Sequence, residues 1–348
     1  RIVLNLSLVA FAGIAVLVFL LARPLSALLA PGFSGEEVTL MAKLTRILLV
    51  TQGFFVFSFF LTGVLKSYQR FLVPAAAPIF YNLGIITGVI FLSGPLGVYA
   101  PVWGAVFGAF LHLLIQFPTA LHLGFRPVFS LNPSYPGVRR ILRLAAPRVV
   151  ELAFLQILRA SDLFFASLIS TASYGYLTFA QHLEMIPVSL FGLSLAEASL
   201  PALSYRRRQG KVFKDTLLLN FRRILFLTLP IAVTFAVLRI PLVRLAFGAS
   251  RFTWDATVLT GLALSMFTIG ILGQALSLYF VRSFYALQNT VTPVLVGVGI
   301  IIFNVLLSAY LVLVLGLPVW GLALSFAISA LGQATILGIL LARKIGFP

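Results

Sequence analysis

The tetrapeptide Pro101-Val-Trp-Gly104 occurs again as Pro318-Val-Trp-Gly321, 217 positions later (101 to 318), and each copy opens a long apolar run. Two further pairs keep nearly the same offset: Pro24-Leu25 with Pro241-Leu242, and Gln69–Pro74 with Gln288–Pro293. These matches predict that the chain contains two copies of one helical unit, an arrangement that many transporters share.

The composition predicts a membrane protein. Hydrophobic residues make up 61% of the 348 residues, charged residues make up 9%, and the mean hydropathy is +1.10. Soluble globular proteins contain roughly 25% charged residues, whereas roughly 20 apolar residues form a helix that crosses a bilayer. Ten stretches reach that length, near 4–22, 43–65, 75–95, 98–122, 141–169, 173–200, 217–239, 256–281, 291–315 and 319–341. They are too long for outer-membrane strands of about 10 residues, so we expect an all-α, polytopic membrane protein with about ten transmembrane helices.

The net charge of +17 is distributed unevenly between the two ends of the predicted helices. Alternate ends carry 17 of the 25 Lys and Arg residues, and the opposite ends carry six. Cationic residues collect on the cytoplasmic side of membrane proteins, so the pattern predicts that residues 1 and 348 both face the cytoplasm. Such a basic surface suits anionic lipid headgroups and argues against a nucleic-acid partner.

A basic segment with three prolines, Gly124–Gly137, is the best candidate for a linker, because Pro and Gly interrupt helices. We therefore predict an N-terminal lobe at 1–123, a cytoplasmic linker at 124–138 and a C-terminal lobe at 139–348. These lobes hold four and six helices. If the second copy begins near 139, the first would begin at position −78 (139 minus 217). We thus expect a parallel repeat of six plus six helices, of which the first two are missing from this chain.

Ionisable side chains inside a predicted span are the strongest functional signal, because lipid penalises each one unless it is paired or hydrated. Beyond Arg143, which belongs to the basic end of the stretch 141–169, four lie in its interior, namely Arg148, Glu151, Arg159 and Asp162. At 3.6 residues per turn they share one stripe less than a quarter-turn wide. The i, i+3 spacing lets Arg148 pair with Glu151, and Arg159 with Asp162. Either these pairs hold the bundle together, or the stripe faces a water-filled cavity and meets an anionic substrate.

The next predicted helix adds His182 and Glu184 in the middle of an apolar run. Imidazole titrates near neutral pH, so His182 could hold a phosphate when protonated, relay protons, or be a neutral side chain with one hydrogen bond. We expect Glu151, Asp162 and Glu184 to set the charge of the cavity or to bind a coupling cation, either a proton or a monovalent metal ion.

No catalytic, cofactor or metal-binding pattern accompanies these residues. The chain has three histidines and no cysteine, which leaves no zinc spacing. It contains neither a Walker A phosphate loop nor a Gly-x-Ser-x-Gly elbow. The sequence predicts a transporter without a cofactor rather than an enzyme, driven by an ion gradient, the membrane potential or consumption of the substrate elsewhere.

Four stretches carry a family resemblance: Arg139-Arg-Ile-Leu-Arg-Leu-Ala-Ala-Pro147, Phe179-Ala-Gln-His-Leu-Glu-Met-Ile-Pro187, Gly192-x-x-x-Ala196 followed by Leu200-Pro-Ala-Leu-Ser204, and Phe284-Tyr-Ala-Leu-Gln-Asn-Thr-Val-Thr-Pro293. They resemble the MurJ (MviN) lipid II flippases of the multidrug/oligosaccharidyl-lipid/polysaccharide exporter superfamily. The resemblance implies two six-helix lobes around a central cavity. There, cationic residues would hold the pyrophosphate of the undecaprenyl-linked peptidoglycan precursor, and alternating access would carry it to the periplasmic leaflet.

The chain departs from the family pattern in two places. Ala180-Gln-His-Leu183 stands where the family commonly has Ala-Asp-Arg-Leu, and the first two helices of the family, which bring basic residues to the cavity, have no counterpart in this chain. We therefore expect Arg148, Arg159 and His182 to contact the pyrophosphate.

The resemblance implies a flippase of the bacterial inner membrane that serves cell-wall synthesis, with lipid II or a related polyprenyl-pyrophosphate lipid as substrate. Membrane lipids and cell-wall synthesis proteins would be further partners. Two alternatives stay open, namely an exporter of another polyprenyl-linked saccharide or of drugs, and a transport-inactive membrane scaffold. A drug exporter would have an acidic cavity, whereas the stripe in 141–169 is balanced in charge.

Overall fold

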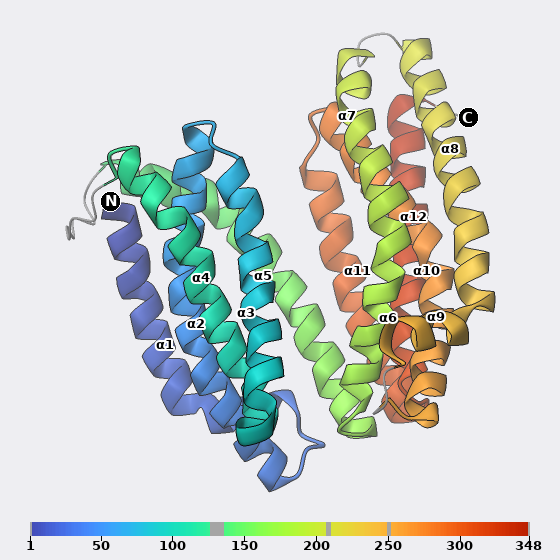
Figure 1. Ribbon diagram of the computed structural model, residues 1–348. Coiled ribbons are helices and arrows are strands. Elements are labelled where there is room, and N and C mark those ends of the chain that lie inside the picture. The colour runs from blue at the N-terminus through green and yellow to red at the C-terminus, as the bar shows by residue number, and fades with distance from the viewer. Residues whose placement is uncertain (1, 126–135, 207–209, 249–251, 347–348) are drawn as a thin grey trace. The chain divides into compact units, whose positions relative to one another are not determined.

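The computed structural model describes residues 2–125, 136–206, 210–248 and 252–346, and these residues form helices and loops without a strand (Figure 1). In the first half of α5 (Pro136–Ile169) several side chains, including those of residues 146–148 and 150–151, are outside the description. The chain divides into two compact units, Arg1–Leu29 with Phe33–Val149, and Ala30–Gly32 with Val150–Pro348. Each unit is described by itself.

Nine segments of the described residues are long and apolar enough to cross a membrane. One of them, Leu72–His122, contains two helices, so every predicted stretch has a helical counterpart. The prediction of an all-α, polytopic membrane protein with about ten transmembrane helices is confirmed.

The first unit contains α1 (Ile2–Leu29), α2 (Gly35–Ser67), α3 (Leu72–Leu96), the 3-10 helix η1 (Gly97–Tyr99), α4 (Ala100–His122) and the start of α5. α2 packs against both α1 and α4. It begins at a capping box in which Ser34 Oγ accepts from the Glu37 N–H at 3.3 Å and the Glu37 carboxylate accepts from the Ser34 N–H at 2.8 Å. This pairing satisfies N–H groups that the first helical turn leaves free, which explains why α2 starts here.

Glycines bring α3 and α4 together. Gly84 lies against Gly108, and Gly88 lies against Gly104, so closely that a Cβ atom on either α3 glycine would overlap the facing backbone. Small residues spaced four apart allow membrane helices to approach at short range. The α3–α4 contact is therefore a contact of main chain with main chain.

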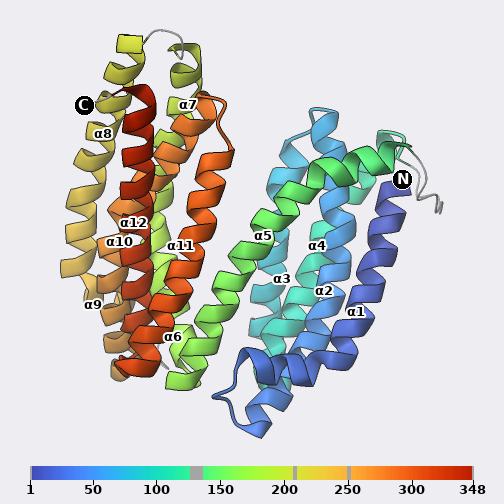
Figure 2. The ribbon, with the colours of Figure 1, turned by 180° about the vertical axis from the view of Figure 1, so that it is seen from behind.

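The second unit continues from the end of α5 with the elements α6 (Ser173–Pro187), the π-helix η2 (Val188–Leu193), α7 (Ser194–Arg206), α8 (Gly210–Val237), α9 (Arg239–Phe247), α10 (Trp254–Ala286), α11 (Val291–Ala309), the π-helix η3 (Tyr310–Val314) and α12 (Trp320–Ile345). α10 is its central helix and packs against α6, α7, α8 and α12. Figures 1 and 2 show α10 and α12 between α8 on one side and α11 on the other.

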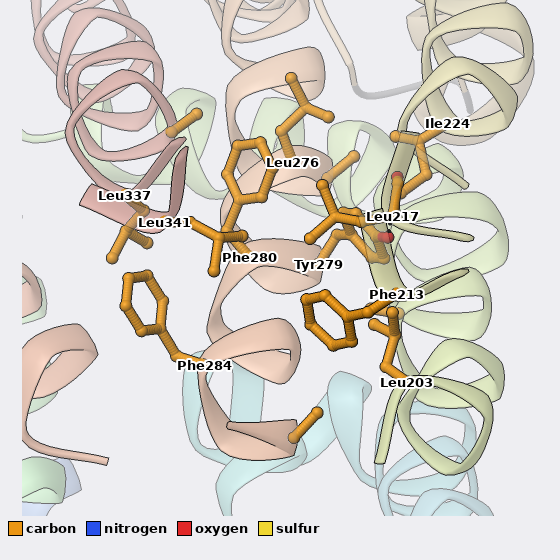
Figure 3. Packing of buried hydrophobic residues seen from close by; sticks show 14 residues of the cluster. Leu203, Phe213, Leu217, Ile224, Leu276, Tyr279, Phe280, Phe284, Leu337 and Leu341 are labelled. Atoms are coloured by element: carbon orange, nitrogen blue, oxygen red, sulfur yellow. Dashed lines mark hydrogen bonds between the residues drawn. The ribbon is translucent and has the colours of Figure 1, made fainter. Parts of the chain in front are cut away.

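A cluster of buried side chains from α7, α8, α10 and α12 forms one part of this unit's core (Figure 3). Tyr279 is fully buried and its hydroxyl donates to the Leu217 carbonyl of α8 at 3.0 Å, as buried tyrosines require. Phe284 and Leu337 pack in the same cluster. α10 is apolar around most of its circumference, as expected of a helix that other helices surround.

The repeat predicted from the sequence is present in the fold, with α2, α3 and α4 corresponding to α10, α11 and α12. Gln69 after α2 and Gln288 after α10 both adopt the left-handed conformation, with φ of 57° and 58°, which is uncommon for residues other than glycine. α10 begins at a Thr253 cap whose Oγ1 accepts from the Ala256 N–H at 3.2 Å. Thr253 lies 219 positions after Ser34 (34 to 253), so both ends of the helix are built alike in the two copies.

The predicted linker at 124–138 is described only at its two ends, because residues 126–135 lie outside the described residues. The two units divide between Val149 and Val150, inside α5. The lobe limits at 123 and 139 therefore stay a prediction.

Candidate substrate and cation site

The charged stripe predicted for 141–169 lies on α5, and the structure describes its second half. Arg148 and Glu151 belong to the helical backbone, but their side chains lie outside the described residues, so their ion pair stays a prediction. Arg159 is exposed and Asp162 is half-buried. Among the contacts of described side chains, none is an ion pair between Arg159 and Asp162.

Arg159 and Asp162 share a different neighbour, the Tyr174 side chain at the start of α6, which lies within electrostatic range of both charges. Tyr174 was not predicted as a site residue, since a tyrosine near a helix start carries no distinctive signal. A guanidinium and a phenol hydroxyl are both hydrogen-bond donors. A guanidinium, a carboxylate and a phenol on α5 and α6 are thus within electrostatic range of one another.

His182 and Glu184 lie on opposite sides of α6. Two positions along an α-helix correspond to a rotation of about 200°, and in the structure His182 is exposed whereas Glu184 is fully buried. His182 lies about three turns after the loop 170–172, and Arg159 lies about three turns before it. The two exposed candidate cations therefore lie at a similar depth along two helices that run back from one loop.

Glu184 faces α10 rather than the exposed side of α6. Its Oε1 accepts from Gln274 Nε2 at 2.7 Å, and its exposed fraction is 0%. Its Oε2 is also buried and has no hydrogen-bond partner among the described residues. Gln274 was not predicted as a site residue, although it is the only amide side chain in the 33 residues of α10, and an amide in an apolar span is a detectable signal.

A second buried polar cluster lies in the first unit, between α2 and α4. His112 Nδ1 lies 2.6 Å from Ser58 Oγ, Gln116 Nε2 donates to the same Oγ at 2.8 Å, and Thr62 Oγ1 donates to Gln116 Oε1 at 2.7 Å. The rings of Phe55 and Phe59 contact the imidazole edge to face. These partners satisfy one another, as buried polar groups must, so the cluster holds α2 to α4.

Metal ligands do not gather in the part of the chain that the structure describes, where no group of three or more His, Asp and Glu side chains is close enough to hold a metal ion. The arrangement instead offers isolated donors on the exposed sides of α5 and α6, and one buried carboxyl between α6 and α10.

The chain is similar to known proteins over its whole length. The family model described as lipid II flippase MurJ matches residues 1–348. The lipid II flippase MurJ of Burkholderia cenocepacia is 28% identical over 333 residues, which cover 93% of this chain and 63% of that protein. A probable lipid II flippase MurJ of Vibrio cholerae is 28% identical over 274 residues, 77% of this chain and 51% of that protein.

Two solved structures share the fold. A lipid II flippase MurJ in an inward closed conformation matches with a TM-score of 0.85 and 22% identity, over 99% of this chain and 72% of that chain. An inward-facing multidrug resistance MATE family transporter matches with a TM-score of 0.82 and 15% identity, over 99% of this chain and 79% of the other. With its apolar helices and a family match from the first residue to the last, the chain is a multi-pass membrane protein and belongs to the lipid II flippase MurJ family.

Proposed function

We propose that the protein to which this chain belongs moves lipid II from the cytoplasmic to the periplasmic leaflet of the bacterial inner membrane by alternating access. The observation that carries the proposal is the family match over residues 1–348. The chain spans 63% of the Burkholderia cenocepacia relative, and we propose the activity, substrate and partners for the whole protein. The reaction involves no covalent step, so the proposal includes neither a catalytic residue nor a cofactor.

In this proposal Arg148, Arg159 and His182 contact the pyrophosphate of the lipid. Arginine binds phosphate oxygens with two parallel hydrogen bonds, and Arg159 is exposed with Tyr174 nearby. His182 is exposed at a similar depth on α6, and its imidazole donates from both nitrogens when it is protonated. Glu151 and Asp162 would offset part of the positive charge, so that the anionic lipid is bound weakly enough to be released.

We also propose that both ends of the chain face the cytoplasm. The support is the placement of 17 of the 25 Lys and Arg residues at alternate helix ends. Because the chain has no cysteine, a Lys211→Cys variant carries a single thiol at an exposed position of α8. A membrane-impermeant maleimide should label it in inverted vesicles and not in intact spheroplasts; the reverse pattern would contradict the orientation.

Complementation tests the proposed activity. Bacteria depleted of their own lipid II flippase should recover growth and shape when they express the gene that encodes this chain with its native upstream sequence. The Arg148→Gln/Arg159→Gln double variant should fail to rescue, because the pyrophosphate loses two guanidinium groups. Lys211→Gln removes an exposed cation from the basic end of α8 and should rescue fully.

Two outcomes would redirect the proposal. Failure of the well-expressed, membrane-inserted protein would favour an exporter of another polyprenyl-linked saccharide or a scaffold for cell-wall synthesis proteins. Full rescue by the double variant would show that Arg148 and Arg159 do not contribute to substrate binding, and the proposed flippase activity would stand.

A further inference from the structure

We infer that Glu184, with Gln274 as its hydrogen-bond partner, is a proton-binding site in the interior of the second unit. This inference deepens the proposed function by naming where a coupling proton binds. The role of this proton in driving transport rests on the proposed function. The existence of the site does not, because α6 and α10 define it.

The geometry around Glu184 favours the neutral acid. The side chain has no exposed surface, Gln274 Nε2 donates to Oε1 at 2.7 Å, and Oε2 is buried without a partner among the described residues. A carboxylate buried among neutral groups loses its hydration without a compensating charge, which strongly disfavours the ionised form. The neutral acid costs less here than the carboxylate, because its carbonyl oxygen accepts from Gln274 and the hydroxyl on Oε2 leaves one unsatisfied donor in place of a buried charge.

Charged neighbours do not alter this conclusion. The elements packed against α6 are η2, α8, α9, α10 and α12, and their titratable side chains are Lys211, Lys214, Asp215, Arg222, Arg223, Arg239, Arg244, Asp255, Tyr279, Arg282, Tyr285, Arg343 and Lys344. α6 itself adds Tyr174, Tyr176 and His182, and the end of α5 adds Arg159 and Asp162. Within the described part of the chain, no ion pair or hydrogen bond joins any of them to Glu184.

A proton suits this site better than a metal ion. Hard cations are held by several oxygen ligands at once, whereas the fully buried side-chain atoms between α6 and α10 include one oxygen without a hydrogen-bond partner among the described residues, Glu184 Oε2. A single oxygen is sufficient for a proton. In the binding step hydronium from the aqueous phase transfers one proton to Oε2, the carboxylate becomes a neutral acid, and one water molecule is released.

The position of Glu184 links its charge to helix packing. Pro187, three residues later, has no N–H and interrupts the hydrogen-bond ladder of α6, and the π-helix η2 begins at Val188. Gly192 of η2 lies against Ala275, the neighbour of Gln274, so tightly that a Cβ would come within 2.9 Å of it. Loss of the proton would require water at Oε2, which is buried, and a separation of α6 and η2 from α10 would admit that water. Deprotonation therefore favours an opened contact, and π-helical turns are frequent at such functional positions.

Infrared spectroscopy of the chain in lipid bilayers tests the site directly, because a protonated carboxyl has a carbonyl band distinct from that of a carboxylate. We expect the chain at neutral pH to show an acid band that Glu184→Gln lacks. Gln274→Leu should keep this band and shift it to higher frequency, because the carbonyl loses its hydrogen bond. Glu197→Gln is the matched control: Glu197 is exposed and pairs with Arg282 at 3.6 Å, so its removal should leave the acid band unchanged.

Two results would overturn the inference. One is an acid band of equal intensity in the chain and in a folded Glu184→Gln variant, which would mean that Glu184 is ionised. The other is loss of the band when NaCl replaces choline chloride at constant pH, which would make the bound cation Na⁺. The Gln variant keeps the size and the hydrogen-bonding capacity of the neutral acid, so helical content measured by circular dichroism should confirm that it folds.

The spectroscopic result is independent of lipid transport. If complementation fails while the Glu184 acid band is present, the proton site stands and the substrate assignment falls. If complementation succeeds while the band is absent, the flippase function stands and the proton site falls.

Discussion

Two helix pairs that occupy the same place in the repeat are held together in different ways. In the first unit, α3 meets α4 through Gly84 and Gly88 against backbone. In the second unit, α11 meets α12 through side chains: Asn304 Nδ2 donates to Ser329 Oγ at 3.2 Å, and Ser308 and Ser325 share a hydrogen bond of 2.6 Å. The difference shows that the repeat preserves the place and direction of the helices, while the chemistry of their contact has diverged.

A second difference concerns the helices on which these pairs pack. The most apolar 18-residue window of α10 is 61% buried, compared with 17% for α2 at the corresponding place. α6, α7 and α8 cover α10, whereas α2 is packed mainly against α1 and α4; the offset of 217 places the counterparts of α6 and α7 before position 1 (173 minus 217), outside this chain. A fully surrounded helix can hold a buried polar contact away from lipid, and Gln274 of α10 with Glu184 is such a contact.

The largest effect on stability is expected at the glycine contact between α3 and α4. Gly84→Ala places a Cβ into the Gly108 backbone, so the helices must separate, and we expect a loss of about 2–3 kcal/mol in the free energy of unfolding. Gly63→Ala in α2 is the control, because nothing lies within 4 Å of its added Cβ; it should gain up to about 1 kcal/mol from helix propensity. Thermal unfolding in detergent measures both changes. Equal effects of the two substitutions would show that the close α3–α4 contact does not determine the stability of the chain.

A smaller effect is expected at the polar contact. Asn304 is buried, and Asn304→Ala removes its hydrogen bonds to Ser325 and Ser329. Because hydrogen bonds between membrane helices contribute on average about 0.6 kcal/mol, we expect a loss of about 1 kcal/mol. Thr335→Ala, which removes a bond only to the Leu331 carbonyl of its own helix, should change stability by less than about 0.5 kcal/mol. A loss at Asn304 as large as that at Gly84 would mean that the two contacts are energetically equivalent.

The fold could be predicted in large part because its signals are local or repeated. Apolar runs of sufficient length predict helices in a membrane, and the matches offset by 217 and 219 positions predict the second copy. Corresponding positions in the two copies adopt the same backbone conformation, as shown by the turns at Gln69 and Gln288 and by the caps at Ser34 and Thr253. His112 shows the limit, since its partner Ser58 lies 54 positions away.

The candidate site could be predicted only in part. Ionisable side chains are rare in apolar runs, so Arg159, Asp162, His182 and Glu184 could be identified from the sequence. The structure places all four in the second unit. The i, i+3 spacing allowed an ion pair between Arg159 and Asp162, but both side chains lie near Tyr174 without pairing within the described residues. Spacing permits such a contact, whereas rotamers and neighbouring helices decide whether it forms.

The all-α membrane bundle and its internal repeat follow from the amino-acid sequence alone, because bilayer thickness and helix geometry translate apolar length directly into spanning helices. Helical periodicity also required His182 and Glu184 to face opposite ways. Which of the two is buried depends on helix packing, because burial requires another helix to cover that face of α6. Glu184 became the interior carboxyl when α10, 90 positions away at Gln274, packed against α6.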